Sequence, residues 1–133
     1  MNDPIEPKCE HLLRENGIHE FIFSESTMAS ADAYLSELEQ IYKQRVDASK
    51  PLLVIFSGAD RTMPLNYTMQ RGKELLARYP NIGTICTAVI TDSAFEARLA
   101  DSFMRVMRFP NTRVRFFAES RRAEAIAWLL QQE

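Results

Sequence analysis

The chain has 133 residues, of which 46% are hydrophobic, and a formal net charge of −2. This length and apolar content predict one domain with a core of its own, and its two widely separated cysteines, Cys9 and Cys86, exclude a disulfide framework or a Cys-x-x-Cys zinc site. The net charge disfavours a protein that coats nucleic acid or an anionic membrane. Because no run of eighteen apolar residues is present, we expect no stable membrane insertion and a cytoplasmic location.

The first elements predicted are an arm and a hairpin. Residues 1–8 carry two prolines and three charged side chains, which predicts a flexible arm ahead of a single domain over 9–133. Residues 11–15 and 18–23 flank Asn16-Gly17, a dipeptide that suits a two-residue type I′ turn because both central residues of that turn need positive φ. We therefore predict an opening β-hairpin that turns at these two residues.

An amphipathic helix is predicted next, over residues 28–46. Its apolar side chains recur at spacings of three and four, at Tyr34, Leu35, Leu38, Ile41 and Tyr42. The candidates for its N-cap are Ser26, Thr27 and Ser30, and Asp32 suits the positive end of the helix dipole.

The stretch 51–66, PLLVIFSGADRTMPLN, organises the rest of the chain. Residues 52–56 are apolar at both parities, which predicts a strand covered on both faces, as in the middle of a parallel sheet. Ligands of open α/β sheets bind beyond the carboxyl ends of the strands. The loop that follows this strand is therefore the first place to look for a binding site.

Strands and helices then alternate to the end of the chain. We predict a helix over 65–79, a strand over 82–91, a helix from Asp92-Ser93 to Phe109-Pro110, a strand with one exposed face at 113–116, and a helix over 120–130. The residues expected to face the core are Leu65, Met69, Gly72, Leu76 and Tyr79 in the first of these helices, and Ala123, Ile126, Ala127 and Leu130 in the last. Gly72 either lets its helix approach the sheet closely or is an ordinary surface glycine.

The resulting order is ββαβαβαβα. Since every strand after the hairpin is followed by a helix, right-handed crossovers predict an α/β fold whose sheet is mostly parallel, with an antiparallel edge strand and helices packed on it.

This order, with the pair Phe116-Phe117 in the last strand and Ala127-Trp128-Leu129 in the terminal helix, resembles the SpoIIAA-like branch of the STAS superfamily. The resemblance covers about residues 9–131. It implies a STAS-like fold and a non-catalytic binding or regulatory module, since STAS domains bind protein partners or small ligands. For the SpoIIAA-like branch, its similarity to Sec14-type domains implies the alternative of a carrier for a small apolar or lipid-like ligand. The features leave a homodimer open and predict no cofactor.

The loop after the central strand supplies the first candidate site: Ser57, Asp60, Arg61 and Thr62. These side chains precede a helix N-terminus, where free N–H groups and the helix dipole favour an anion, including a phosphate on Thr62. In STAS antagonists the same place holds an aspartate-serine-serine-glycine motif. Here Asp60 and Thr62 are the nearest equivalents, while the serine pair and the glycine are absent. The alternative role of Asp60 and Thr62 is to cap or brace a turn.

A second candidate site is an apolar pocket between helices and sheet. Methionine adapts to varied shapes, so such a pocket could be lined by Met63, Met69, Phe95, Phe103 and Met107. The alternative is that these side chains belong to an ordinary packed core.

The remaining polar candidates are two histidines and a group of arginines. His11 and His19 both fall in the hairpin, where we expect them to point into solvent as ordinary strand residues rather than to form a base or a metal pair. The arginines, at positions 105, 108, 113, 115, 121 and 122, gather around the last strand, where they form either a solvated surface or a site for an acidic partner. With no catalytic motif visible, we predict neither an enzyme nor a metal site.

Overall fold

The computed structural model describes residues 9–23, 28–45, 49–57, 65–91, 98 and 112–132. Within them the chain forms β1 (Cys9–Leu13), β2 (His19–Phe23), α1 (Met28–Gln44), β3 (Leu52–Ser57), α2 (Leu65–Arg78), β4 (Ile85–Thr91), β5 (Thr112–Ala118), the short 3₁₀ helix η1 (Glu119–Arg121) and α4 (Arg122–Leu130). The predicted arm over 1–8 and, except for Arg98, the helix predicted to begin at Asp92-Ser93 lie outside the described residues.

The predicted fold class is confirmed. The described strands form one five-stranded sheet in the order β1-β2-β3-β4-β5. The first pair is antiparallel, and β2, β3, β4 and β5 run parallel to one another. The apolar run of β3 lies in the middle of this order with residues 52–56 all buried, as its lack of alternation predicts.

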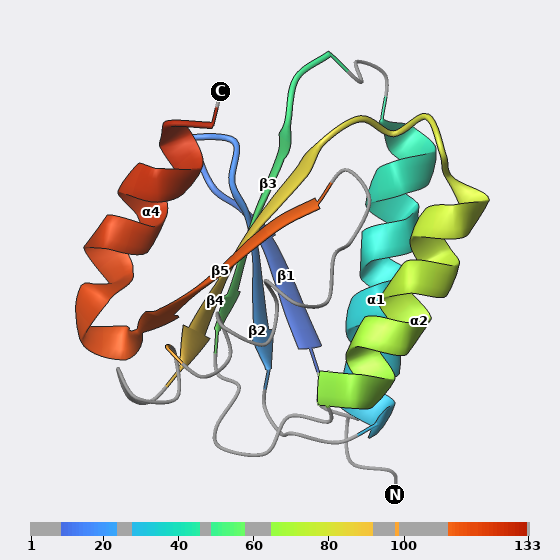
Figure 1. The fold of residues 1–133 in the computed structure, drawn as a ribbon, viewed down its shortest axis with the longest axis horizontal. Coiled ribbons are helices and arrows are strands. Elements are labelled where there is room, and N and C mark those ends of the chain that lie inside the picture. Colours follow the sequence, from blue (N-terminus) through green and yellow to red (C-terminus); the bar gives the residue numbers. More distant parts are fainter. Residues whose placement is uncertain are drawn as a thin grey trace, which may run out of the picture.

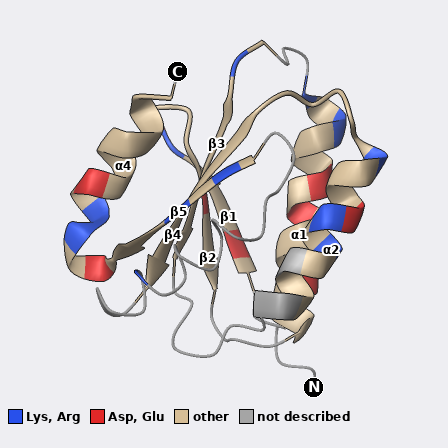
Figure 2. Cartoon of the chain, in the orientation of Figure 1, with Lys and Arg blue, Asp and Glu red and all other residues tan. Residues whose placement is uncertain are grey.

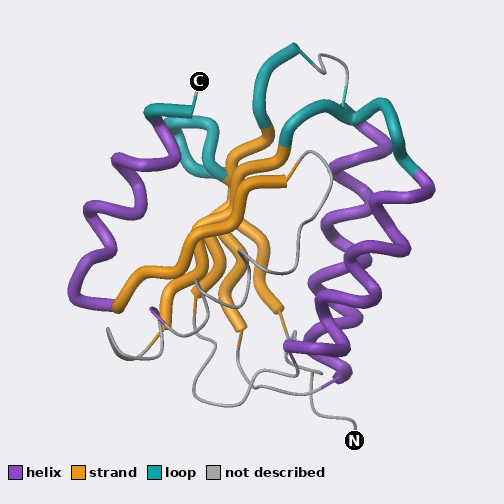
Figure 3. The backbone as a smooth tube through the Cα atoms, in the orientation of Figure 1, coloured by secondary structure: helices purple, strands orange, loops and turns teal. Residues whose placement is uncertain are grey.

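Helices cover both faces of the sheet (Figure 1). α1 and α2 lie side by side on one face, and α4 lies on the opposite face against β3, β4 and β5. The tube in Figure 3 shows the same three layers, with the helices on either side of the strands. Successive residues of a strand point to opposite faces, so β3 contributes to both layers.

Each face therefore has its own apolar core. On the α1 side the core includes the aromatic rings of β2 and α1, with Phe21, Phe23, Tyr34, Val54 and Phe56 at its centre. On the α4 side it includes Leu53, Ile55, Cys86, Ala88, Phe117, Ala125 and Leu129. The parity of a residue in its strand thus decides which helix it contacts.

The hairpin turn differs from the prediction by one residue. Leu13 pairs with His19, and beyond this pair the amide of Arg14 donates to the carbonyl of Ile18 at 2.9 Å. The loop therefore contains three residues, Glu15, Asn16 and Gly17, instead of the two of a type I′ turn. The amide of Gly17 donates to the carbonyl of Arg14 at 3.0 Å, and Gly17 has a positive φ of 83°. The Asn16 side chain accepts a 3.2 Å hydrogen bond from the amide of Ile18. Asn-Gly suits this loop as well as it suits a two-residue turn.

The predicted inward face is only partly right in α2 and is displaced in α4. In α2 Leu75 is buried while Leu76 and Tyr79 are only partly buried, and in α4 the buried residues are Ala125 and Leu129. Ala123, Ala127 and Leu130, which we expected to face inward, are exposed. α4 is apolar over most of its circumference, so the periodicity alone could not fix its phase.

Two smaller corrections concern α1 and β4. Ser30 lies inside α1, fully buried, and does not cap the helix, while Ser26 and Thr27 lie outside the described residues. β4 begins at Ile85, three residues later than predicted, because Gly83 adopts a positive φ of 84° that no regular strand allows.

Two glycines provide a matched test of backbone freedom. Gly17 has the left-handed conformation of the hairpin loop, whereas Gly72 lies within α2 and a methyl group added there would meet nothing within 4 Å. The close-approach interpretation of Gly72 is therefore wrong. We expect Gly72→Ala to stabilise the protein by up to about 1 kcal/mol and Gly17→Ala to destabilise it by about 1 kcal/mol, both measured by chemical denaturation. A destabilising Gly72→Ala would contradict the open space seen around this position.

Candidate functional site

The site predicted in the loop after β3 is described only at its start. Ser57 is the last residue of β3, half-buried, and lies beside Ile22 of β2. Asp60, Arg61 and Thr62 lie outside the described residues. So do Met63, Phe95, Phe103 and Met107 of the predicted apolar pocket, and Met69 is helical with a side chain that is not described. Both sites therefore stay predictions.

A buried carboxylate marks a different place on the sheet. Glu20 lies in β2 between β1 and β3, and its side chain is 1% exposed. Its neighbours His19 and Phe21 point to the α1 side, so strand alternation directs Glu20 to the α4 side. An ionised carboxylate removed from water in this way needs partners, because its desolvation costs several kcal/mol.

Two arginines supply these partners. Arg14, beside the hairpin loop, donates from Nε to Oε2 of Glu20 at 3.1 Å, and its terminal NH2 group contacts the same oxygen. Arg122, the first residue of α4, donates to the other oxygen, Oε1. Each carboxylate oxygen thus faces a different guanidinium group, and the cluster ties the hairpin to a helix 102 residues further along the chain. We call these three residues the Glu20 cluster.

The Glu20 cluster lies in an open groove of about 520 Å³ between the hairpin and α4, which we call the hairpin–α4 groove. Apolar residues of the lining are Leu13, Ile18, Ile55 and Ile126. Leu13 pairs directly with His19, so its side chain lies on the α1 side of the sheet. Glu20 itself is buried, but the side chains of Arg14 and Arg122 are 50% and 39% exposed. Of the charged side chains that reach solvent in this lining, Arg14 and Arg122 are cationic and Glu15 is anionic.

The sequence indicates some residues of this site but does not show that they contact one another. Arg122 belongs to the arginines expected around the last strand, and it contacts Glu20 instead of forming only a solvated surface. The signal for Glu20 is its position in the stretch 18–23, which is apolar except for Glu20 and His19. Arg113 and Arg115 are exposed on β5, where Arg113 donates to Oε1 of Gln132 at 2.7 Å and Arg115 lies 5.1 Å from the Phe117 ring centre.

The two histidines do not point into solvent as predicted. On the α1 side of the hairpin, Nε2 of His11 lies 2.9 Å from Nδ1 of His19, and both side chains are half-buried. The His11 ring also stacks on Phe21, with ring centres 4.7 Å apart. The register places the two histidines diagonally across β1 and β2 on one face, which explains their contact.

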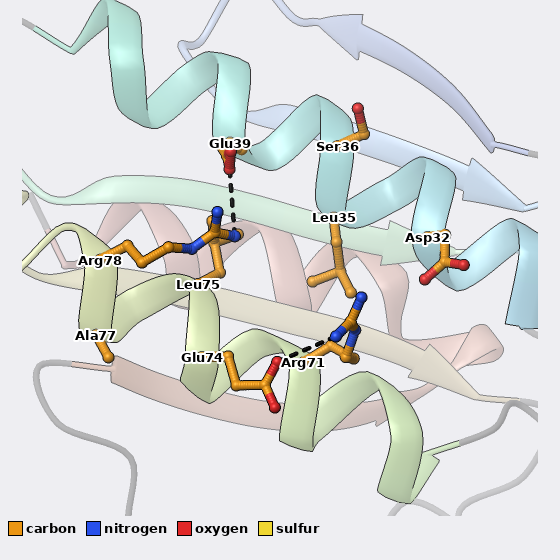
Figure 4. A pocket seen from close by; sticks show the side chains of 9 residues that line it. All are labelled: Asp32, Leu35, Ser36, Glu39, Arg71, Glu74, Leu75, Ala77 and Arg78. Atoms are coloured by element: carbon orange, nitrogen blue, oxygen red, sulfur yellow. Dashed lines mark hydrogen bonds and ion pairs between the residues drawn. The ribbon is translucent and has the colours of Figure 1, made fainter.

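A second groove, of about 740 Å³, runs between α1 and α2 (Figure 4). Its charged side chains pair with one another: Arg78 of α2 lies 3.3 Å from Glu39 of α1, and Arg71 lies 3.2 Å from Glu74. The hydroxyl of Tyr67 also donates to Asp32, a bond that raises the pKa of Tyr67. The Arg78–Glu39 and Tyr67–Asp32 contacts join the two helices, whereas Arg71–Glu74 is a pair within α2. The polar side chains of this groove thus hold α1 and α2 together.

Charged side chains of either sign occur along α1, α2 and α4, whereas the strands carry few of them (Figure 2). In the part of the chain described here, no three His, Cys, Asp or Glu side chains are grouped to hold a metal ion. Likewise, none of the described helices is long and apolar enough to cross a membrane. Comparison with models of protein families, with curated proteins and with solved structures finds no match to this chain.

Proposed function

We propose that this chain is a non-catalytic, STAS-like binding or regulatory module of the cytoplasm, and that the hairpin–α4 groove docks an acidic segment of a protein partner. The observation that carries the proposal is the Glu20 cluster. One buried carboxylate holds two half-exposed guanidinium groups at the side of an open groove.

The chemistry of arginine supports this role. A guanidinium group has five N–H donors in a fixed planar fork, and contact with Glu20 uses part of them. Since the buried carboxylate fixes the orientation of both groups, a carboxylate of the partner would meet donors that have already lost much of their side-chain freedom. Such preorganised cations favour a carboxylate or phosphate over a neutral group.

The apolar lining supports a segment that is not purely acidic. Ile126 lines the groove and is half-buried, while Ile18 and Ile55 lie beneath it, each only 2% exposed. A partner segment that alternates leucine and glutamate would place an apolar side chain on Ile126 and carboxylates on Arg14 and Arg122. Asp60, Arg61 and Thr62 stay predicted contacts of the same partner.

Fluorescence anisotropy with a labelled peptide of alternating leucine and glutamate tests the proposal. We expect saturable binding that weakens as salt is raised, and a loss of affinity of about tenfold or more in Arg122→Gln, the equivalent of about 1.4 kcal/mol or more. The adjacent Arg121→Gln is the matched control, because Arg121 is exposed and its ion pair is with Glu124 of the same helix region. The affinity of the Arg121→Gln variant for the peptide should change less than twofold.

Equal losses in Arg121→Gln and Arg122→Gln would mean attraction by overall charge and would contradict docking at the groove. Binding of an uncharged acyl chain in place of the peptide, unaffected by Arg122→Gln, would favour the apolar carrier instead.

A further inference from the structure

The two histidines of the hairpin belong to a short relay of titratable groups. Oε2 of Glu37 in α1 lies 3.6 Å from Nδ1 of His11, and Nε2 of His11 lies 2.9 Å from Nδ1 of His19. The two imidazole rings stack, with centres 5.1 Å apart and planes inclined by 24°. The relay therefore runs carboxylate, imidazole, imidazole from α1 across β1 to β2.

The facing nitrogens set a limit on the number of protons. A hydrogen bond between Nε2 of His11 and Nδ1 of His19 needs one N–H and one lone pair, so the pair keeps it when both rings are neutral or when one of them is protonated. When both rings are charged, both facing nitrogens carry a hydrogen and the bond is lost. Two cations would then face each other at 2.9 Å.

The surroundings make His19 the ring that resists a proton. Burial lowers the pKa of His19 first, and the nearby His11 and Arg45 lower it further. Glu37, by contrast, lies on the far side of His11 from His19, with its Oε2 3.6 Å from Nδ1 of His11. One proton on the two rings is therefore compatible with the His11–His19 hydrogen bond, whereas a second proton would break it.

The other titratable groups on this side of the hairpin stay neutral. Burial raises the pKa of the Cys9 thiol to about 12, with Glu37 adding to the shift. Burial also raises the pKa of the Tyr34 and Tyr42 hydroxyls on α1. Among the groups described around the pair, Arg45 is thus a cation that adds to the lowering of the pKa of His19, and Glu37 is the carboxylate that faces His11.

The histidine pair and the Glu20 cluster occupy opposite faces of the same two strands. Leu13 pairs directly with His19, and Arg14 follows Leu13 with its amide donating to the carbonyl of Ile18 at 2.9 Å. Glu20 follows His19 in β2. A change in the spacing of β1 and β2 at the histidines therefore displaces Arg14 relative to Glu20.

We propose that the His11–His19 pair is a pH-sensitive latch: addition of the second proton separates the turn end of β1 from β2 and loosens the contact of Arg14 with Glu20. The consequence for peptide docking rests on the function proposed above, since the latch would then weaken the hairpin–α4 groove in acid. The separation of β1 from β2 does not depend on peptide docking.

The direction of the pH effect follows from the lowered pKa of His19. An unfolded histidine titrates near 6.5, so below that pH the unfolded hairpin binds a proton that the folded one resists. The stabilisation from this pair is complete above about pH 6.5 and decreases as the pH falls toward the lowered value. Carboxylates titrate near pH 4, which leaves pH 7.5 to 5.5 as the window for the latch.

NMR across this window tests the latch. We expect the protection factor of the Arg14 amide, corrected for intrinsic exchange, to fall several-fold between pH 7.5 and 5.5, and the Nε–Hε signal of Arg14 to broaden or shift in parallel. His19→Phe removes the ring that resists the proton, so in this variant both changes should vanish. His11→Phe, which keeps a ring stacked on Phe21, also leaves a single titratable ring, so both changes should vanish in this variant too.

Peptide anisotropy on the same samples separates the two proposals. If the Arg14 signals change with pH as expected but the peptide binds at no pH, only the proposed function is refuted. An Arg14 amide with the same pH dependence in the wild type and in His19→Phe would overturn the latch, as would independent titration of both rings near pH 6.5. If His19→Phe fails to fold, His19→Gln provides the comparison, because it keeps a polar side chain without a basic ring.

Discussion

Replacement of Phe56 with alanine is expected to lower the free energy of unfolding by about 3 to 5 kcal/mol. Phe56 is 2% exposed in the central strand β3. Its ring centre lies 4.2 Å from that of Phe23 and 4.9 Å from that of Tyr34, so truncation would leave a cavity among rings held by two strands and α1. Chemical denaturation monitored by circular dichroism measures the change.

Leu13→Ala is the control for the loss of an apolar side chain. Because most of the Leu13 side chain is in solvent, its truncation should change the free energy of unfolding by no more than about 0.5 kcal/mol. A loss in Phe56→Ala of the same small size would mean that the ring is not packed as the structure has it.

The second large effect is expected at the Glu20 cluster. Arg122→Gln removes the guanidinium group that contacts Oε1 of a fully buried carboxylate, and Arg14 contacts the other oxygen. A hydrogen bond to a charged group contributes about 1.5 to 3 kcal/mol, and we expect a loss of stability in this range. The matched change Arg121→Gln removes an exposed ion pair between residues three apart, which should cost no more than about 0.5 kcal/mol.

A double-mutant cycle identifies the partner of Arg122. If Arg122 acts through Glu20, the loss caused by Arg122→Gln should largely disappear in a Glu20→Gln background, since no buried charge is left to stabilise. Losses that simply add in the double variant would show that Arg122 stabilises α4 in some other way. Denaturation of the four proteins in one buffer gives the coupling energy.

The architecture could be predicted because it depends on long, unambiguous patterns. Residues 52–56 are apolar at both parities, which only a strand covered on both faces tolerates, and the charged-apolar alternation of Arg113 to Phe116 matches the exposed face of β5. A prediction of helix or strand stays correct when a boundary is wrong by one residue. The phase of α4 and the length of the hairpin loop cannot be predicted in this way, because a shift of one residue changes each of them.

The length of the hairpin loop also decides which residues of β1 share a face with His19. A two-residue turn at Asn16-Gly17 would place Glu10 and Leu12 on the same face as His19, whereas the observed register places Cys9 and His11 there. The histidine contact therefore could not be read from the hairpin signal alone. The neighbouring arginine and histidine sites both follow from the three-residue loop.

The Glu20 cluster could be predicted only in part. A glutamate inside the mainly apolar stretch 18–23 indicates a buried charge that needs a partner, but nothing in the spacing selects Arg122 from the other arginines near the end of the chain. The selection depends on where α4 crosses the sheet and on its rotation, and tertiary packing fixes both. The predictions at Asp60, Arg61 and Thr62 stay untested.

The Nε–Hε signals of Arg14, Arg121 and Arg122 give the most direct test of docking at the hairpin–α4 groove. They can be followed by NMR while the peptide of alternating leucine and glutamate is added at pH 7.5. The docking proposal predicts saturable shifts for Arg14 and Arg122 at the concentrations that saturate anisotropy, with the Arg121 signal unchanged. Unmoved signals of Arg14 and Arg122 at saturation, or an equal shift of Arg121, would contradict it.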